Sequence, residues 1–259
     1  MPDISLTMLI VLCLAAGAAG WIDAVVGGGG LLLLPALLLG LPHVPAAHIL
    51  GTNKAVAIVG TSGAAVTYAR KAPVKVKTAV RIGLAALAGS MTGAFFAAGI
   101  SSAVLRPVIL VVLVGVAAFV MLKPAFGTGP SGQPVTRSRT VTAIVLVGGG
   151  IGLYDGLFGP GTGTFLVLAL TAVLHLDLVT ASATAKIVNV CTNAGALAMF
   201  SYQGNVMWQL AAIMAVFNLA GGMLGARMAL KKGSEFVRGV LLVVVFSLVA
   251  KLAFDQWNA

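Results

Sequence analysis

The stretch Gly20-Trp-Ile-Asp-Ala-Val-Val-Gly-Gly-Gly-Gly30 places a carboxylate, Asp23, inside an apolar run that ends in four glycines. A related stretch, Gly152-Leu-Tyr-Asp-Gly-Leu-Phe-Gly-Pro-Gly-Thr162, follows later and contains Asp155. Glycine costs a helix about 1 kcal/mol per residue relative to alanine, so we predict that a helix breaks at each cluster. In a membrane, broken backbone is stable only where protein or a water-filled cavity satisfies its polar groups. Two matching breaks therefore indicate the binding site of a transporter.

The composition is that of a membrane protein. Hydrophobic residues make up 59% of the 259 residues and charged residues 8%, whereas a soluble domain carries roughly 25% charged residues. The mean hydropathy is +1.08. We therefore expect an all-α polytopic protein of the inner (cytoplasmic) membrane, with the lipid bilayer as its surroundings. The net charge of +10 is concentrated in a few loops, as the positive-inside rule predicts, so we expect no nucleic-acid partner.

The apolar segments form two sets of five. They lie at about 5–24, 31–42, 46–69, 78–99 and 102–122, and at about 141–157, 163–176, 180–202, 206–229 and 236–254. Adding 132 to a position in the first set gives its counterpart, so that Asp23 matches Asp155 and Lys54 matches Lys186. We therefore predict a first transmembrane repeat at 1–122, a cytoplasmic linker at 123–140 and a second repeat at 141–259. The second segment of each set is too short to span a bilayer, which predicts a half-helix or a re-entrant piece.

The loop charges predict how the two repeats are oriented. The connection after the third segment carries Arg70, Lys71, Lys75, Lys77 and Arg81, whereas its counterpart at 201–208 carries no basic residue. At the next connection the bias reverses, and the second repeat carries Arg227, Lys231, Lys232 and Arg238. Because positively charged loops face the cytoplasm, we predict inverted-topology repeats with the N- and C-termini both outside.

Four ionisable residues recur inside the apolar segments: Asp23, Lys54, Asp155 and Lys186. A charge at that depth is costly and is by default functional or paired. One interpretation is that two structural Asp–Lys pairs each hold one repeat together. The other is that the lysines face a central cavity and attract an anion, while the aspartates hold the glycine breaks or relay protons. Because the two repeats differ in sequence, we expect only one aspartate to couple protons.

Two further features favour an anion. A glycine-rich break that opens a helix presents free N–H groups and the positive end of the helix dipole. Polar residues of the third segments also share one helical face, although a hydrogen-bonded helix seam would explain them equally well. The predicted substrate-binding residues are Lys54, Lys186, Gly28, Gly29, Gly30, Gly161, Thr162, Gly163, Asn53, Thr52, Asn189 and Asn193, and the proton-coupling candidates are Asp23 and Asp155.

The sequence carries no catalytic triad spacing, no His/Cys metal cluster and no cofactor motif. We therefore expect the protein not to be an enzyme, and we expect neither a cofactor nor a metal site.

Three motifs together resemble the sulfite exporter TauE/SafE family of small bacterial and archaeal membrane carriers. They are Asp23-(x)3-Gly27-Gly-Gly-Gly30, Gly51-Thr-Asn-Lys54 and Asp155-(x)3-Gly159-Pro-Gly-Thr-Gly163. The resemblance implies export of sulfite, or of a small organosulfur anion such as sulfoacetate, across the cytoplasmic membrane. The resulting hypothesis is an alternating-access secondary transporter coupled to protons. An uncoupled anion channel and a non-transporting membrane subunit are the alternatives.

Overall fold

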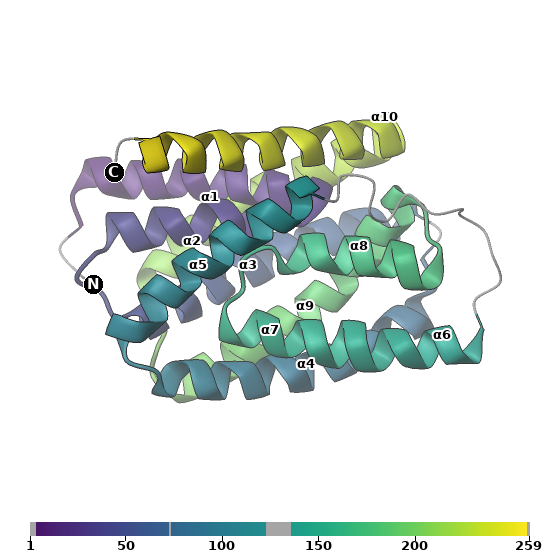
Figure 1. Ribbon diagram of the computed structural model, residues 1–259, viewed down its shortest axis with the longest axis horizontal. Coiled ribbons are helices and arrows are strands. Elements are labelled where there is room, and N and C mark those ends of the chain that lie inside the picture. Colours follow the sequence, from purple (N-terminus) through teal and green to yellow (C-terminus); the bar gives the residue numbers. More distant parts are fainter. Residues whose placement is uncertain (1–3, 73, 123–135, 258–259) are drawn as a thin grey trace.

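The structure, a computed structural model, describes residues 4–72, 74–122 and 136–257, which form helices joined by short connections (Figure 1). The first repeat contains α1 (Leu6–Val26), α2 (Gly29–Gly40), α3 (Ala46–Ala69), α4 (Val76–Gly99) and α5 (Ser102–Leu122). The second contains α6 (Arg137–Thr142), the π-helix η1 (Ala143–Gly150), α7 (Ile151–Leu157), α8 (Thr162–Leu174), α9 (Leu178–Tyr202) and α10 (Trp208–Trp257). The described residues contain no strand, and the all-helical prediction is confirmed.

The helix bounds of the two repeats agree at the offset of 132 positions. Helix α9 covers the counterpart of α3, and the consecutive helices α6, η1 and α7 together cover the counterpart of α1. Helix α10 is interrupted at Gly233, where φ is 75° and ψ is −168°, so its two arms cover the counterparts of α4 and α5. The duplication seen in the sequence is therefore matched helix by helix.

The predicted linker at 123–140 is only partly described. Residues 123–135 lie outside the described residues, and α6 already begins at Arg137. Thr136 caps this helix, because its side chain accepts a hydrogen bond from the backbone N–H of Arg139 at 3.3 Å.

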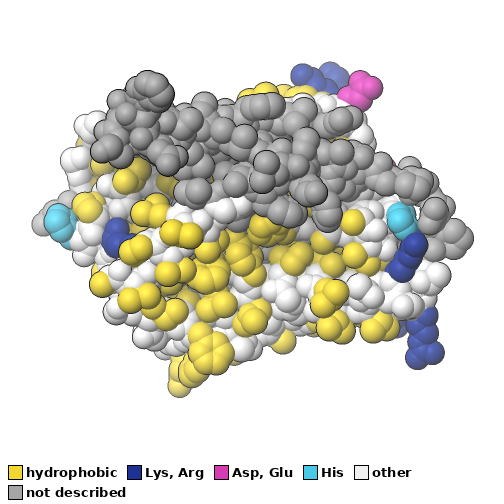
Figure 2. All heavy atoms as spheres, viewed as in Figure 1, with side chains coloured by type: hydrophobic (Ala, Val, Ile, Leu, Met, Phe, Trp, Pro, Cys, Tyr) yellow, Lys and Arg dark blue, Asp and Glu magenta, His cyan; other side chains and the backbone are white. Residues whose placement is uncertain are grey.

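Five helical stretches of the described residues are long and apolar enough to cross a bilayer. They are Leu6–Val26, Ala46–Ala69, Val76–Gly99, Arg137–Leu157 and Trp208–Val237. Figure 2 shows hydrophobic side chains spread over the middle of the visible face, with Lys, Arg and His side chains towards its edges. The protein is therefore a multi-pass membrane protein, as the composition predicted.

Small residues let neighbouring helices approach each other closely. A Cβ atom at Gly93 of α4 would lie 2.2 Å from the carbonyl oxygen of Leu153, in α7. A Cβ atom at the equivalent Gly225 of α10 would lie 2.5 Å from the carbonyl oxygen of Trp21, in α1. Because lipid removes most of the hydrophobic drive for helix association, such close packing is the main source of cohesion.

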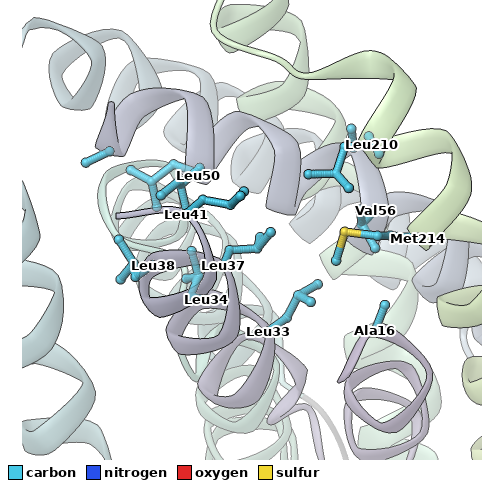
Figure 3. Packing of buried hydrophobic residues seen from close by; sticks show 14 of the residues in the cluster. Ala16, Leu33, Leu34, Leu37, Leu38, Leu41, Leu50, Val56, Leu210 and Met214 are labelled. Atoms are coloured by element: carbon cyan, nitrogen blue, oxygen red, sulfur yellow. The ribbon is translucent and has the colours of Figure 1, made fainter. Parts of the chain in front are cut away.

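The short helix α2 turns back along α1. Its first residue, Gly29, lies against Ala19, whereas its last residue, Gly40, lies against Met8 near the start of α1. Helices α2 and α8 have 12 and 13 residues, too few for the hydrocarbon core of about 30 Å. Both predicted short segments are thus short helices. The leucines of α2 lie among side chains of α3 and α10, as Figure 3 shows.

Two connections that are equivalent in sequence lie at different ends of α3. Lys71 directly follows the C-terminal end of α3. In the connection between α9 and α10, by contrast, the backbone N–H of Met207 donates to the hydroxyl of Thr52 at 3.0 Å, near the N-terminal end of α3. A Cβ atom at Gly51 would likewise lie 2.0 Å from the carbonyl oxygen of Asn205. The basic connection after α3 and its uncharged counterpart are therefore separated by the length of this helix.

Candidate functional site

The two glycine-rich breaks lie against each other. Gly27, which ends α1, has a φ of 80°, and its carbonyl oxygen accepts a hydrogen bond from the backbone N–H of Thr164 at 3.1 Å. The hydroxyl of Thr164 donates to the carbonyl oxygen of Val26 at 3.0 Å. Backbone groups that have no partner within their own helix are thus bound by the opposite break. Broken backbone within a membrane requires such partners.

The second break is braced by its own side chains. Gly159 and Gly161 have φ values of 85° and 74°, a region that glycine enters without strain. The hydroxyl of Thr162 donates to the carbonyl oxygen of Gly159 at 3.0 Å, and the phenol of Tyr154 donates to the carbonyl oxygen of Pro160 at 2.5 Å. This break is therefore held in one conformation before α8 begins.

Two ion pairs with buried lysines join the repeats to each other. The Nζ atom of Lys54 in α3 lies 2.6 Å from Oδ1 of Asp155 in α7, and Nζ of Lys186 in α9 lies 2.8 Å from Oδ2 of Asp23 in α1. Each lysine thus pairs with the aspartate of the other repeat. The interpretation in which each pair holds a single repeat together is wrong, because each third-segment helix packs against the break of the opposite repeat.

Asp23 supports the first break through its backbone and its side chain. Its backbone carbonyl oxygen accepts from the N–H of Gly27 at 2.8 Å and also from the ammonium group of Lys186. Its Oδ2 atom accepts from Lys186 and from the hydroxyl of Thr61, the latter at 3.2 Å. Lys186 therefore binds the C-terminal end of α1 as well as the carboxylate, a favourable position for a cation.

Asp155 is bound less completely. Its Oδ1 atom pairs with Lys54, but its Oδ2 atom is buried and has no hydrogen-bond partner in the described structure. Its side chain is 2% exposed. Lys54 also lies close to the second break, because its Nζ atom is 3.3 Å from the position that a Cβ atom added at Gly159 would occupy. An unpaired buried carboxylate oxygen is unusual in a folded protein.

A cavity of about 30 Å³ lies between the two breaks, enough for one or two water molecules. Eight of the predicted binding residues line it: Asn53, Lys54, Gly29, Gly30, Thr162, Gly163, Asn189 and Asn193. Both aspartates line it as well. The geometry thus brings together, from six helices, most of the residues selected from the sequence.

The other predicted binding residues, Lys186, Thr52, Gly28 and Gly161, are not part of the cavity lining. Lys186 is fully buried against Asp23, and the hydroxyl of Thr52 is bound by the backbone of Met207. Gly28 and Gly161 are the N-cap residues of α2 and α8, directly before the helical turns that reach the cavity.

Sequence reasoning missed Asn218 and did not select Thr61 for the site, although both line the cavity. Asn218 is buried in α10 and its amide donates to the carbonyl oxygen of Ala16 at 2.8 Å. The available signal was an amide side chain in the middle of an apolar segment, which is costly unless it is bound.

The cavity combines ion-paired charges with many hydrogen-bonding groups. Each of its two aspartates is paired with a lysine, of which only Lys54 lines the cavity, so a positive potential comes from the N-terminal turns of α2 and α8. Amide and hydroxyl groups from α3, α8, α9 and α10 complete the lining. The described residues contain no group of His, Cys, Asp and Glu that could hold a metal ion. This arrangement suits a small polar or anionic solute.

A multi-pass helical protein with paired helix breaks around a central polar cavity has the architecture of a membrane transporter. The chain belongs to the sulfite exporter TauE/SafE family, whose model matches residues 12–252. The family resemblance noted in the motifs is thereby confirmed.

Relatives with similar sequences carry names of the same kind. The chain is 33% identical over 256 residues to "Probable membrane transporter protein ORF9" of Sinorhizobium sp., covering 98% of this chain and 96% of the relative. It is 32% identical to a "Probable membrane transporter protein" of Haemophilus influenzae, covering 98% of each chain. It is also 32% identical to "Probable membrane transporter protein YfcA" of Escherichia coli K12, covering 98% of this chain and 92% of the relative. No solved structure matches the chain.

Proposed function

We propose that the protein is a secondary transporter that moves sulfite, or a small organosulfur anion such as sulfoacetate, across the inner membrane. The observation that carries the proposal is the Lys54–Asp155 ion pair in the cavity, with one carboxylate oxygen left without a partner. The family membership supports an anionic sulfur compound as the substrate. The two helix N-termini at the cavity provide N–H groups for such an anion.

In the proposed mechanism, Asp155 and the substrate anion compete for Lys54. An ionised Asp155 occupies the ammonium group, so the anion binds best when Asp155 takes up a proton and releases Lys54. A proton and an anion then cross together. Asp23 has a supporting role in this scheme, because Lys186 and Thr61 both bind its Oδ2 atom. The unequal hydrogen bonding of the two aspartates supports a division of roles between them.

Alternating access is the transport mode that fits the cavity. With a volume of about 30 Å³, the cavity must widen before it admits a sulfur oxyanion. The short helices α2 and α8 each follow a glycine break, so they are the elements that we expect to move. A channel would instead need a continuous open path.

We also propose that the two repeats are inverted, with both termini outside the cell. The separation of the basic α3–α4 connection from its uncharged counterpart along α3 supports this arrangement. So do the reciprocal ion pairs, because each break receives the lysine of the other repeat.

Cysteine labelling tests the inversion. Lys77 and Gln209 are equivalent exposed positions in the first turns of α4 and α10. In a background without Cys13 and Cys191, we expect K77C to react from the cytoplasmic side and Q209C from the outside, measured with a membrane-impermeant maleimide on intact and opened cells. Reaction of both from the same side would show that the repeats are not inverted.

The function itself is tested by flux into proteoliposomes that contain the purified protein. We expect radiolabelled sulfite to accumulate well above the level in protein-free liposomes and faster than sulfate, with a rate that depends on the imposed pH gradient. Sulfite flux that ignores the pH gradient would identify an uncoupled channel. The absence of flux for sulfite, sulfate and sulfoacetate alike would refute the proposed substrate class.

A further inference from the structure

A groove of about 900 Å³ lies between α3 and α10, separate from the central cavity. Its body is mostly apolar and is lined by Ile58, Val59, Val66, Leu219, Met223 and Leu230. Val59 is 36% exposed and Val66 is 54% exposed, so these side chains are open to the surroundings. At 3.6 residues per turn, Val59 and Val66 lie on the opposite face of α3 from the cavity residues Lys54 and Thr61.

Four cations gather where the groove ends. Arg70 and Lys71 follow α3, and Arg227 and Lys231 lie on α10 shortly before its interruption at Gly233. All four are exposed, and none forms an ion pair with a described residue. These positive charges beside an apolar groove must be solvated by water or bound by an anionic partner.

The equivalent surface of the protein lies between α9 and α4, which are the counterparts of α3 and of the first arm of α10. At the offset of 132, the four cations are replaced by Tyr202, Gln203, Phe95 and Gly99, none of which is charged. The cationic end, to which each repeat contributes two residues, is therefore present at the α3–α10 surface and not at its counterpart, so it is not a consequence of the duplicated helix packing. By the positive-inside rule it lies at the cytoplasmic leaflet, where anionic lipids meet basic pockets between helices.

We propose that this groove binds one anionic phospholipid. Its phosphate lies among Arg70, Lys71, Arg227 and Lys231, and its acyl chains lie along the apolar walls of α3 and α10. A soluble anion would gain nothing from the apolar body of the groove. A second copy of the chain would bring two unpaired cationic clusters together, which repel. A phospholipid matches both the apolar body and the cationic end of the groove.

The test measures lipid retention by the full-length protein in detergent. Phosphatidylglycerol and phosphatidylcholine with identical acyl chains are titrated, and bound lipid is counted by native mass spectrometry. We expect tighter binding of phosphatidylglycerol, and a roughly 10- to 30-fold loss of that affinity in R70Q/R227Q. The control K75Q/K77Q removes two exposed charges of the neighbouring basic connection that lie outside the groove, and should bind like the unchanged protein.

Each other outcome overturns the proposal. Equal retention of both lipids would show a groove without headgroup recognition, and equal losses in the two double variants would show an attraction to overall charge only. The rise in the thermal unfolding temperature is also compared for inorganic phosphate and phosphatidylglycerol. An equal rise with inorganic phosphate would show that the cations bind a soluble anion. A lipid-free dimer that R70Q/R227Q dissociates would assign the groove to a second copy.

Discussion

Replacing Gly27 with alanine should abolish transport and destabilise the protein, because the new Cβ atom has no room. It would lie 2.0 Å from the carbonyl carbon of Gly163 and 2.4 Å from the backbone nitrogen of Thr164. The φ of 80° at Gly27 adds a penalty of about 1–2 kcal/mol for any residue with a side chain. The contact between the two breaks would have to open, and a displacement of about 1 Å at such a site costs on the order of 100-fold in rate.

The neighbouring Gly28 is a matched control for this prediction. Its φ is −94°, and a Cβ atom there would approach no atom closer than the Ile22 side chain at 3.3 Å. We expect G28A to keep most of its transport rate and its thermal unfolding temperature, and G27A to lose both. If G27A transports as well as G28A, the two breaks do not meet as described.

Replacing Lys54 with glutamine should have the second-largest effect, because the change strands Asp155. Removing one partner of a buried ion pair costs about 3–5 kcal/mol. Lys54 is 2% exposed and Asp155 is equally buried, so water cannot compensate for the lost charge. We expect K54Q to lower the thermal unfolding temperature and to eliminate measurable sulfite binding.

Two further variants separate stability from binding. The double change K54Q/D155N removes both charges and should recover much of the unfolding temperature without restoring sulfite binding. Lys186 is the equivalent position and lies outside the cavity lining. K186Q should therefore destabilise the protein, but the protein that does fold should keep its preference for sulfite over sulfate. If K54Q/D155N binds sulfite normally, Lys54 holds the helices together and does not bind the substrate.

The sequence predicted the helices well because their signals are local. The segments predicted at 46–69 and 102–122 coincide with α3 and α5, and the glycine clusters do interrupt the helices that contain Asp23 and Asp155. Most other boundaries shift by a few residues. The helix α6 starts within the predicted linker, where a single threonine cap begins the helix earlier than the hydropathy suggests.

The pairing of the charges depended on tertiary contacts. Lys54 and Asp155 are far apart in sequence and belong to different repeats, so no local spacing could reveal that they meet. The same applies to Asn218, which reaches the cavity because Gly20 and Gly60 leave room for α10 beside α1 and α3. The sequence could indicate which residue types form the site. Only the docking of the repeats determines that Lys54 lines the cavity while Lys186 supports the first break.

The most direct measurement of the central claim is sulfite flux by D155N and D23N in proteoliposomes, with and without a pH gradient. If Asp155 carries the proton that releases Lys54, D155N should still exchange sulfite for sulfite but should no longer respond to the gradient. D23N should lose transport and stability together, because Asp23 holds Lys186 and Thr61 at the first break. Gradient-driven flux that persists in a well-folded D155N would contradict the account, because the proton would then have to bind elsewhere.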